Sequence, residues 1–558
     1  MSLKLSPIPP VPPDTARVAR AAFPTGNIYM KLREEVGTLV QDEDFVALFS
    51  KEGPPGLPPW RLALVTILQF REHRSDRQAA DAGRARIDWQ YLLSLELGDA
   101  GFDFSGLSEF RARLVAGGAE ELLLEKLLHW SQAAGLVKAR GKQRTDSPHV
   151  VAAIRAMNRV ELVSETLRAA LNELAVCAPE WVQMVAPPDW YERYRRRRED
   201  ERLPKGKEAR EAYARTVGED GFWLLAALDT AAAPPQLQEL ESMNTLRTMW
   251  QQHYERTPSQ DPGAGFSSRP QVRWKELREL PRAAEQIESP YDLDARYCTK
   301  RSTKWVGYKV HYTETCDVEN IYLSTQVQTT PATLHDVHCT APIQAALSQR
   351  GLTPHDHIVD AAYIDAELLV SSRQEHGITL VGPPRPNSSW QTKVEGGYNR
   401  EQFTVEWDQR QVRCPQGKLS STWKEQADPA RTPSISVHFR QQDCAVCPTR
   451  ACCTRSPQQP RHLNLLPRPQ FEALQAARAE QTSEAGRQLY SRRAGIEGTL
   501  SQSVRGFGLR RTRYRGLKKT HLQHVMTAVA VNVGRIVAGL DHIPRAKTRT
   551  SRFAALAA

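Results

Sequence analysis

Strand and helix signals alternate between residues 305 and 381, and no other part of the sequence restricts the fold as strongly. Residues 305–313 (WVGYKVHYT) and 321–329 (IYLSTQVQT) are rich in β-branched and aromatic side chains and flank a turn-prone segment, which predicts a β-hairpin. The elements expected next are a helix at about 334–349, a strand at 357–360, a helix at 364–375 and a strand at 378–381. Such alternation after a hairpin predicts an α/β fold, with a mixed sheet covered by helices.

The chain has 558 residues and is too long for one simple core. With 40% hydrophobic and 25% charged residues, its composition is that of an ordinary globular protein. We therefore expect one large domain with appendages. The expected segments are a proline-rich lead (1–57), a helical domain (58–137), an α/β core (138–389 and 466–542) interrupted by a helical insertion (about 151–290), a cysteine-rich insertion (390–465) and a basic tail (543–558).

The formal net charge is +11, which fits a polyanionic partner. Each Lys or Arg that neutralises a phosphate releases a condensed counterion, so basic proteins are attracted to nucleic acids. The N-terminus lacks the uninterrupted apolar stretch of a signal peptide, and no stretch approaches the roughly 18 apolar residues of a membrane span. We therefore expect no membrane partner and a cytoplasmic protein with reduced thiols.

The region before residue 138 shows a helical pattern. Residues 60–73 (WRLALVTILQFREH) repeat apolar side chains at helical spacing, and Ser75 with Gln78 forms a capping-box pair for a following short helix. Further helices are expected at about 89–95 and from Ser108. Short helices with basic faces are typical of a DNA-binding module, although a bundle that only packs or dimerises has the same pattern.

A group of reactive side chains lies in a long charged helix expected at about 468–503. Tyr490, Arg493 and Glu497 are spaced i, i+3 and i+7, so a helix places all three on one face. A carboxylate there can bind a metal ion, while the guanidinium and the phenol can meet a nearby phosphate. An ordinary Arg–Glu surface pair has the same spacing.

A strongly basic stretch follows directly. Residues 505–519 (RGFGLRRTRYRGLKK) contain seven Lys or Arg and no acid, with Phe507 and Tyr514 interleaved. Such a stretch can follow a nucleic-acid backbone and stack on bases. The DNA-binding residues expected here are Arg505, Arg510, Arg511, Arg513, Arg515, Lys518 and Lys519.

The cysteines are unevenly distributed, because five of the nine fall between residues 414 and 453. Cys414 opens a Cys-Pro-x-Gly turn, Cys444 and Cys447 form a C-x2-C pair followed by proline, and Cys453 comes shortly after. These four thiolates are enough for a tetrahedral, structural Zn²⁺, which would leave no open position for catalysis. Cys452 could replace Cys453, and free thiols in a loop-rich insertion remain the alternative.

Several blocks of the sequence resemble one family, in the family's order. Y-x2-R-x3-E on a late helix is the signature of a large group of bacterial insertion-sequence transposases with a DDE catalytic triad. Similar blocks are PGLPPWRLALVTILQFREHRSDRQAAD with FDFSGLSEFRARL, RTDSPHV, DARYCTKRSTKWVGYKVHYTET and HIVDAAYID. The resemblance spans about residues 54 to 535 and implies a ribonuclease-H-like core.

The resemblance assigns the catalytic carboxylates to Asp146, Asp360 and Glu497. Residues 138–150 are expected to form a strand leading into a loop, which suits Asp146. Asp360 follows the apolar pair Ile358-Val359 at a strand end, where the sites of mixed sheets collect. Without the resemblance, other acids would compete, namely Asp292, Asp294 and Asp365. The family's lysine beyond the glutamate is replaced by Val504 here, beside the basic Arg505.

The chemistry follows from these ligands. Transfer of a phosphodiester needs water or a 3′-hydroxyl in line with the phosphorus, and two hard cations about 3.5–4 Å apart stabilise the attacking and leaving oxygens. We expect two Mg²⁺ or Mn²⁺ ions per active site, held by carboxylates. The resemblance also implies a double-stranded DNA partner (terminal inverted repeats and target DNA) and a homodimer on DNA, because two ends must be joined.

Three alternatives stay open. The chain could be a catalytically inactive DNA-binding repressor derived from a transposase, or a zinc-dependent nuclease of another type. Tyr490 leaves a covalent recombinase formally possible. His149, His311 and His335 are expected to be hydrogen-bonded core or cap residues and are not assigned to the site.

Overall fold

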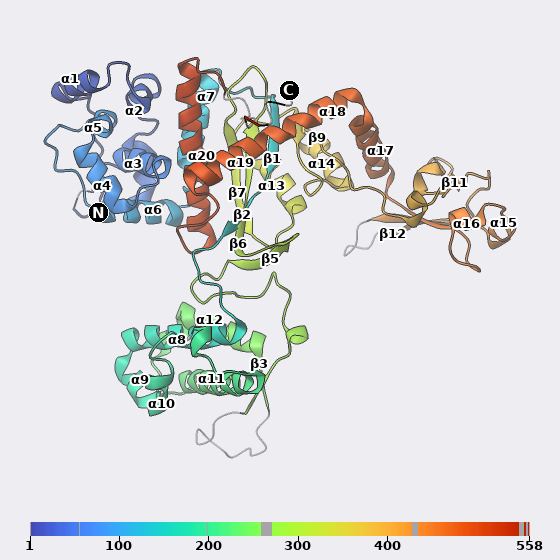
Figure 1. Ribbon diagram of the computed structural model, residues 1–558, viewed down its shortest axis with the longest axis horizontal. Helices are drawn as coiled ribbons and strands as arrows, with labels where there is room; N and C mark the ends of the chain where they lie inside the picture. The colour runs from blue at the N-terminus through green and yellow to red at the C-terminus, as the bar shows by residue number, and fades with distance from the viewer. Residues whose placement is uncertain are drawn as a thin grey trace.

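The computed structural model describes residues 2–54, 56–197, 199–257, 271–426, 433–545, 552–553 and 556. Figure 1 shows helices, a central sheet and two appendages that project from it. Most of the basic tail expected at 543–558 lies outside the described residues. Within the described part of the chain, no helix is long and apolar enough to cross a membrane.

The central sheet is mixed. Its main strands are β1 (Lys142–Asp146), β6 (Thr303–Thr315), β7 (Ser324–Pro331), β8 (Asp356–Ile358) and β9 (Thr379–Val381). They lie side by side in the order β7-β6-β1-β8-β9; β6 is antiparallel to both neighbours, whereas β1, β8 and β9 are parallel. The predicted α/β class and the hairpin at 305–329 are confirmed, and the mixed sheet is consistent with a ribonuclease-H-like DDE domain.

Two further strands pair with the beginning of β6. They are β2 (His149–Val151) and β5 (Arg296–Lys300), and β5 was not expected from the sequence. Both pair with Gly307, whose φ of 151° suits glycine; a Cβ there would overlap the backbone of Val150. The chain therefore leaves the sheet after β2 and returns at β5 at nearly the same place, which is how the helical insertion is accommodated.

Helices cover the sheet and join it to the N-terminal region. They are α13 (Thr340–Gln349), α14 (Ala366–His376), α19 (Gly495–Phe507) and α20 (Leu517–Leu540). The long α20 lies between the N-terminal helices and the sheet in Figure 1. Its buried Asn532 exchanges hydrogen bonds with the backbone of Ser324 on β7, and Arg71 of the N-terminal region donates to the carbonyl of Ala530. One continuous apolar core therefore serves both regions.

The N-terminal region is largely helical from Pro13 onward. Its helices are α1 (Pro13–Ala22), α2 (Ile28–Lys31), a π-helical turn (Leu32–Val36), a 3₁₀ helix (Asp42–Leu48), α3 (Pro59–Arg71), α4 (Asp76–Ala85), α5 (Ile87–Leu93), α6 (Ser105–Ala116) and α7 (Leu122–Ala133). The predicted capping box of Ser75 and Gln78 is present. Residues 1–57 differ from the proline-rich lead expected, because Tyr29 and Phe45 are buried in the same core as Trp60.

The helical insertion has a core of its own. Its elements are α8 (Arg159–Cys177), α9 (Pro179–Val185), α10 (Pro188–Arg193), α11 (Lys207–Leu228), α12 (Glu241–His253) and the paired strands β3 (Tyr254–Arg256) and β4 (Val272–Trp274). Trp250 is fully buried at its centre and packs so closely on Gly221 that a Cβ there would overlap the indole. In Figure 1 this insertion lies below the sheet.

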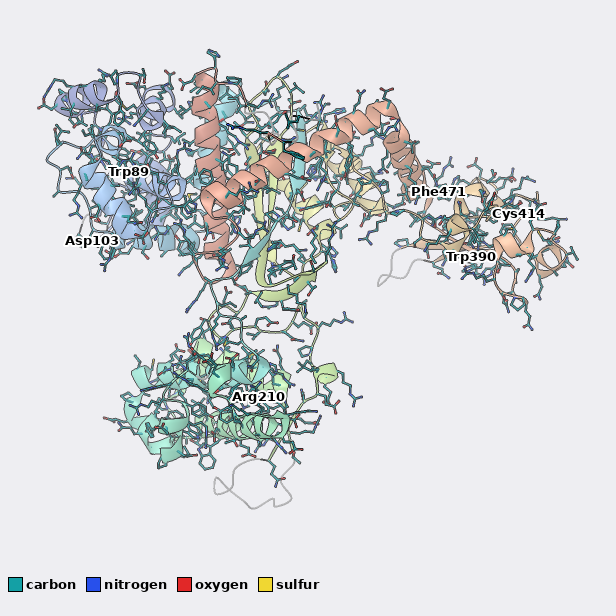
Figure 2. The ribbon with its side chains drawn as sticks, in the orientation of Figure 1. Trp89, Asp103, Arg210, Trp390, Cys414 and Phe471 are labelled. Atoms are coloured by element: carbon teal, nitrogen blue, oxygen red, sulfur yellow. The ribbon has the colours of Figure 1, made fainter. Side chains whose placement is uncertain are left out.

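The cysteine-rich insertion is a small β structure at the end of an arm. Its elements are β10 (Thr404–Glu406), β11 (Gln411–Arg413), β12 (Thr422–Gln426), β13 (Ser434–His438), α15 (Gln441–Ala445), α16 (Arg450–Cys453) and β14 (His462–Leu465). Figure 2 shows Cys414 within this arm and Phe471, on α17 (Arg468–Thr482), at its junction with the helices. The ring of Phe471 lies 5.4 Å from that of Trp407, which attaches the arm to α17.

The prediction of a single helix over 468–503 is wrong. The segment is divided into α17, α18 (Glu484–Ser491), a 3₁₀ turn (Arg492–Ala494) and α19. Ser483 causes the first break, because its side chain accepts a hydrogen bond from Gly486 N and begins a new helix. Figure 1 shows α18 and α19 running in line over the sheet, while α17 turns away toward the arm.

Candidate active site

Asp146 and Asp360 lie at one edge of the sheet. Asp146 is the last residue of β1, and Asp360 follows the end of β8 by two residues. These strands are parallel neighbours with Arg144 opposite Ile358, and continuing that register puts the two aspartates opposite each other. Their carboxylates therefore emerge together at the carboxyl ends of the strands, where α/β folds place their sites.

Arg493 links these two aspartates to Glu497. Its Nη2 lies 2.8 Å from Asp146 Oδ2 and 3.8 Å from Asp360 Oδ2, and its Nη1 lies 3.6 Å from Glu497 Oε1. The exposed fraction of the side chain is 15% for Asp146 and 27% for Asp360, but 68% for Glu497. Three carboxylates thus converge on one cation, two from the buried sheet edge and one from the exposed face of α19.

The two aspartates are held by their own turns. Asp146 Oδ1 accepts a hydrogen bond from Ser147 N and Asp360 Oδ1 accepts one from Ala362 N, each at 2.8 Å. Burial raises the pKa of Asp146, with a contribution from the nearby charge of Asp360, while the Arg493 guanidinium opposes the rise. Burial also raises the pKa of Tyr490, which is half-buried beside the same charges. The site is therefore a partly desolvated cluster of negative charge.

The donor chemistry of this cluster suits a hard divalent cation, because carboxylate oxygens are the usual protein ligands of Mg²⁺. Among the described residues, no three His, Cys, Asp or Glu side chains stand in an arrangement that could hold a metal ion. At the sheet edge the Arg493 guanidinium lies among the three carboxylates.

Sequence reasoning missed a set of buried polar residues beneath the carboxylates. Arg144, Glu314 and Thr499 are all less than 5% exposed and are hydrogen-bonded to one another. The one available signal was the composition of residues 142–146 (KQRTD), which is unusually polar for a strand whose three central residues are buried. Of the histidines, His311 is fully buried and bonded to Tyr363, as expected of a core residue.

The basic stretch at 505–519 is divided between anchored and exposed side chains. Arg510 is bonded to His149, Arg513 to the carbonyl of Arg74, and Arg515 lies over the ring of Tyr291. The exposed members without such an anchor in the contacts described are Arg505, Arg511, Lys518 and Lys519. Val504, in the place of the family's lysine, packs against the core instead.

The two aromatic residues of the stretch are partly buried. Phe507 and Tyr514 both pack against the main core, and Tyr514 also lies under the guanidinium of Arg111. Part of each ring therefore contributes to the fold, and stacking of these two rings on bases stays a prediction.

The four cysteines expected to bind zinc line one cavity of about 170 Å³; they are Cys414, Cys444, Cys447 and Cys453. Of the five cysteines described in this insertion, only Cys452 is absent from its lining. Lys418 N donates a hydrogen bond to Cys414 Sγ at 3.3 Å across the turn at Gly417, whose φ is 78°. Burial and the other three thiols raise the pKa of Cys453 to about 11.

Comparison with known protein families finds two models that match parts of the chain. A model described as "Transposase DDE domain" matches residues 413–537, and one described as "Transposase domain (DUF772)" matches residues 17–113. No curated protein and no solved structure matches the chain. Both models describe transposases. Together the two matches support an insertion-sequence DDE transposase, the family that the sequence resembles.

The DDE match carries general consequences. DDE domains belong to polynucleotidyl transferases, they generally use divalent metals such as Mg²⁺, and transposases act on DNA. The matched segment includes Glu497 and the four cysteines, whereas Asp146 and Asp360 precede it. The assignment of the two aspartates therefore rests on the sheet geometry.

Proposed function

We propose that this transposase binds the terminal inverted repeats of its insertion sequence, cuts DNA strands there and joins them to target DNA. The observation that carries the proposal is the convergence of Asp146, Asp360 and Glu497 on Arg493 at the ends of two adjacent parallel strands. No protein nucleophile is required. Water attacks the phosphorus of the scissile phosphodiester and the opposite P–O bond breaks; a 3′-hydroxyl then attacks target DNA in the same way.

Asp146, Asp360 and Glu497 would hold the metal ions, two per site. Bound Mg²⁺ or Mn²⁺ supplies positive charge to the attacking and leaving oxygens of the phosphoryl transfer. Asp146 and Asp360 contribute preorganisation, because the backbone N–H at each turn fixes one oxygen and leaves the other facing the shared space. Glu497, on the exposed face of α19, would be the third carboxylate ligand.

Arg493 and Tyr490 are proposed to bind the DNA phosphate. Within the described part of the chain, Arg493 Nε is buried with no hydrogen-bond partner, so it could donate to a phosphate once the guanidinium turns away from the carboxylates. The planar guanidinium fork matches phosphate oxygens in bidentate geometry. The Tyr490 hydroxyl lies close enough to Arg493 and Asp360 to respond to their charges, and it can donate to the same phosphate.

The basic stretch is proposed to follow the DNA backbone away from the site. Its exposed members supply sequence-independent attraction; they are Arg505, Arg511, Lys518 and Lys519. Arg510, Arg513 and Arg515 contact other parts of the protein and so fix the stretch in place. Part of each guanidinium is proposed to contact DNA as well. A homodimer is proposed on DNA, because two element ends have to be joined in one reaction.

The cysteine cavity is proposed to hold a structural Zn²⁺. The N–H···S bond to Cys414 stabilises a thiolate, and both cysteines of the C-x2-C pair line the same cavity. The side chains would have to turn inward around the ion. Cys453 is proposed as the fourth ligand because it, and not Cys452, lines the cavity.

The test is cleavage of a labelled duplex that carries the element's own end, with Mg²⁺, with Mn²⁺ and without metal. Glu497→Gln is expected to lower the cleavage rate by at least the roughly 100-fold that loss of a metal-site partner costs, while leaving DNA binding intact. The matched control is Glu484→Gln, which removes an exposed carboxylate from α18 and is expected to cut normally.

Each other outcome has a defined meaning. Specific binding by the wild type with no cutting in either metal would support the repressor instead. Equal cutting by the wild type and Glu497→Gln would place the active site elsewhere. A protein–DNA adduct through Tyr490 would establish a covalent recombinase.

A further inference from the structure

A buried carboxylate lies directly beneath the active site. Glu314 on β6 is fully buried, and its Oε1 accepts hydrogen bonds from Arg144 Nε at 2.8 Å and Arg144 Nη2 at 2.6 Å. Its Oε2 accepts from Thr499 Oγ1 at 2.5 Å and from Arg535 Nη1 at 3.0 Å. Four hydrogen bonds from three different elements therefore converge on one side chain, and none of these residues belongs to the proposed metal ligands.

Arg144 connects this carboxylate to the strand of the first aspartate. It precedes Asp146 by two residues on β1, so both side chains point to the same face of the sheet. While two of its nitrogens bind Glu314, its Nη1 donates to the backbone carbonyl of Arg492 in the turn before α19. The planar fork of arginine thus spans two elements at once, which a lysine cannot do.

The same group determines how α19 begins. Gly495 is the first residue of α19, and a Cβ there would overlap the Arg144 guanidinium. Glycine at this position therefore allows the helix to approach β1 closely. Glu497 lies two residues further along α19, and Thr499, which donates to Glu314, lies two residues beyond that. The start of the helix and its next turn are both tied to the Arg144–Glu314 pair.

We propose that Arg144 and Glu314 are positioning residues that fix Glu497 relative to Asp146, so that the two carboxylates can bind the same metal ion. This inference rests on the proposed function. Burying an ion pair requires removing both charges from water, and apolar residues of similar size often stabilise a fold as well or better. The arrangement is better explained by geometry, because one rigid guanidinium spans the strand of one ligand and the helix turn of another.

The test measures metal binding without DNA. The affinity for Mn²⁺, measured by electron paramagnetic resonance titration of the full chain, is compared for the wild type, Arg144→Lys and Thr499→Val. Arg144→Lys keeps the charge and is expected to weaken Mn²⁺ binding by about 10- to 100-fold, the usual effect of losing a partner that orients metal ligands. Thr499→Val removes the hydrogen bond to Glu314 and the one that Thr499 Oγ1 accepts from Arg535 Nη2, with little change of shape. It is expected to weaken Mn²⁺ binding about 5-fold.

A second measurement needs no metal. Hydrogen exchange of the α19 amides is expected to become faster in Arg144→Lys, because the link to the Arg492 carbonyl and the anchor of the helix are lost. The matched control is Arg193→Lys, which alters an ion pair of Arg193 with the fully buried Asp220 in the helical insertion. That control is expected to change neither Mn²⁺ affinity nor exchange in α19. Raising the Mn²⁺ concentration is expected to restore cleavage by Arg144→Lys.

The outcomes separate this inference from the proposed function. Asp146→Asn is included in each titration. If Asp146→Asn abolishes Mn²⁺ binding while Arg144→Lys and Thr499→Val bind as the wild type does, only the positioning role is wrong. If Asp146→Asn binds Mn²⁺ normally, the carboxylate site itself is wrong. Should Arg144→Lys fail to fold, wild-type affinity in the milder Thr499→Val would overturn the inference.

Discussion

The two insertions interrupt the same α/β core but are stabilised in different ways. The helical insertion buries a large apolar cluster that includes Leu167, Leu224 and Trp250. Among its described residues, the cysteine-rich insertion has a core cluster of only seven buried apolar residues, on its strands or next to them. Because the buried fraction of a chain rises with its size, a small unit gains little from its core and usually depends on disulfides or a metal ion.

The difference shows what each insertion can contribute. The helical insertion has a large apolar core of its own, and the ion pair between Arg168 and the buried Glu165 adds to it. The arm places its small core beyond α17, with four thiols around one cavity and none of them in a disulfide. Metal ions are therefore expected to matter in two separate places, one for chemistry at the sheet edge and one for folding at the end of the arm.

The largest expected effect is on the arm. Removing zinc with a chelator, or replacing Cys447 by serine, is expected to unfold the arm, since structural Zn²⁺ supplies about 10–16 kcal/mol of apparent binding free energy in small zinc domains. Hydrogen exchange in peptides from β13 and β14 is expected to rise to the rate of an unfolded chain. Peptides from α8 and α11 should be unchanged, and metal analysis should find one zinc per wild-type chain.

The serine variant of Cys452 is the control for this prediction. Cys452 does not line the cavity, so Cys452→Ser is expected to keep both the zinc and the slow exchange. Loss of zinc in Cys452→Ser but not in Cys453→Ser would show that Cys452, and not Cys453, is the fourth zinc ligand. An arm that stays folded after complete removal of zinc would show that its cluster of seven buried apolar residues is enough to stabilise the fold.

The next largest effect is expected in the helical insertion. Trp250→Ala removes a fully buried indole whose Nε1 donates to the carbonyl of Gly218, and is expected to destabilise this insertion by about 3–5 kcal/mol. Denaturant dependence of hydrogen exchange in α8 and α11 measures the loss. Trp423→Ala in the arm removes a half-buried ring and is expected to have a smaller effect while zinc is bound. Equal losses would contradict the role given to core size.

How much the sequence could predict depends on where the partners of each residue lie. Asp360 follows the apolar Ile358 and Val359, so its place at a strand end was visible locally. The strand of Asp146 is polar because its side chains find partners far along the chain: Arg144 binds Glu314, 170 residues away, and Thr145 binds His357. Local periodicity carries no information about such pairs.

The helix of Glu497 shows the same limit. Its spacing of reactive residues was clear, and the break at Ser483 follows from a local cap. The turn at 492–494, in contrast, adjoins a long-range contact, because Arg144 donates to the carbonyl of Arg492. Gly495 is required by the Arg144 guanidinium, a contact that no helical pattern contains. The alternation of strands and helices was predictable because it follows from local polarity, whereas the position of α19 depends on a buried polar network.

The smallest effect expected is the dependence on pH that His253 gives to the stability of the helical insertion. His253 is buried there, and burial, with the nearby charges of Arg159 and Lys275, lowers its pKa to about 3. The folded insertion therefore keeps this imidazole neutral below pH 6.5, the ordinary value, where the unfolded chain takes up a proton. Its stability is complete above pH 6.5 and falls as the pH drops toward 3, by about 1.4 kcal/mol per pH unit.

Hydrogen exchange in α12 and β4, followed from about pH 7 to about pH 5 and corrected for the intrinsic pH dependence of exchange, measures this loss, which should reach about 2 kcal/mol. His253→Gln keeps an acceptor for Arg159 Nε, which donates to His253 Nδ1 at 2.8 Å, and cannot titrate. The variant is expected to lose the dependence on pH. If it keeps the full dependence, another group carries it, and the stability of the helical insertion does not rest on a neutral His253.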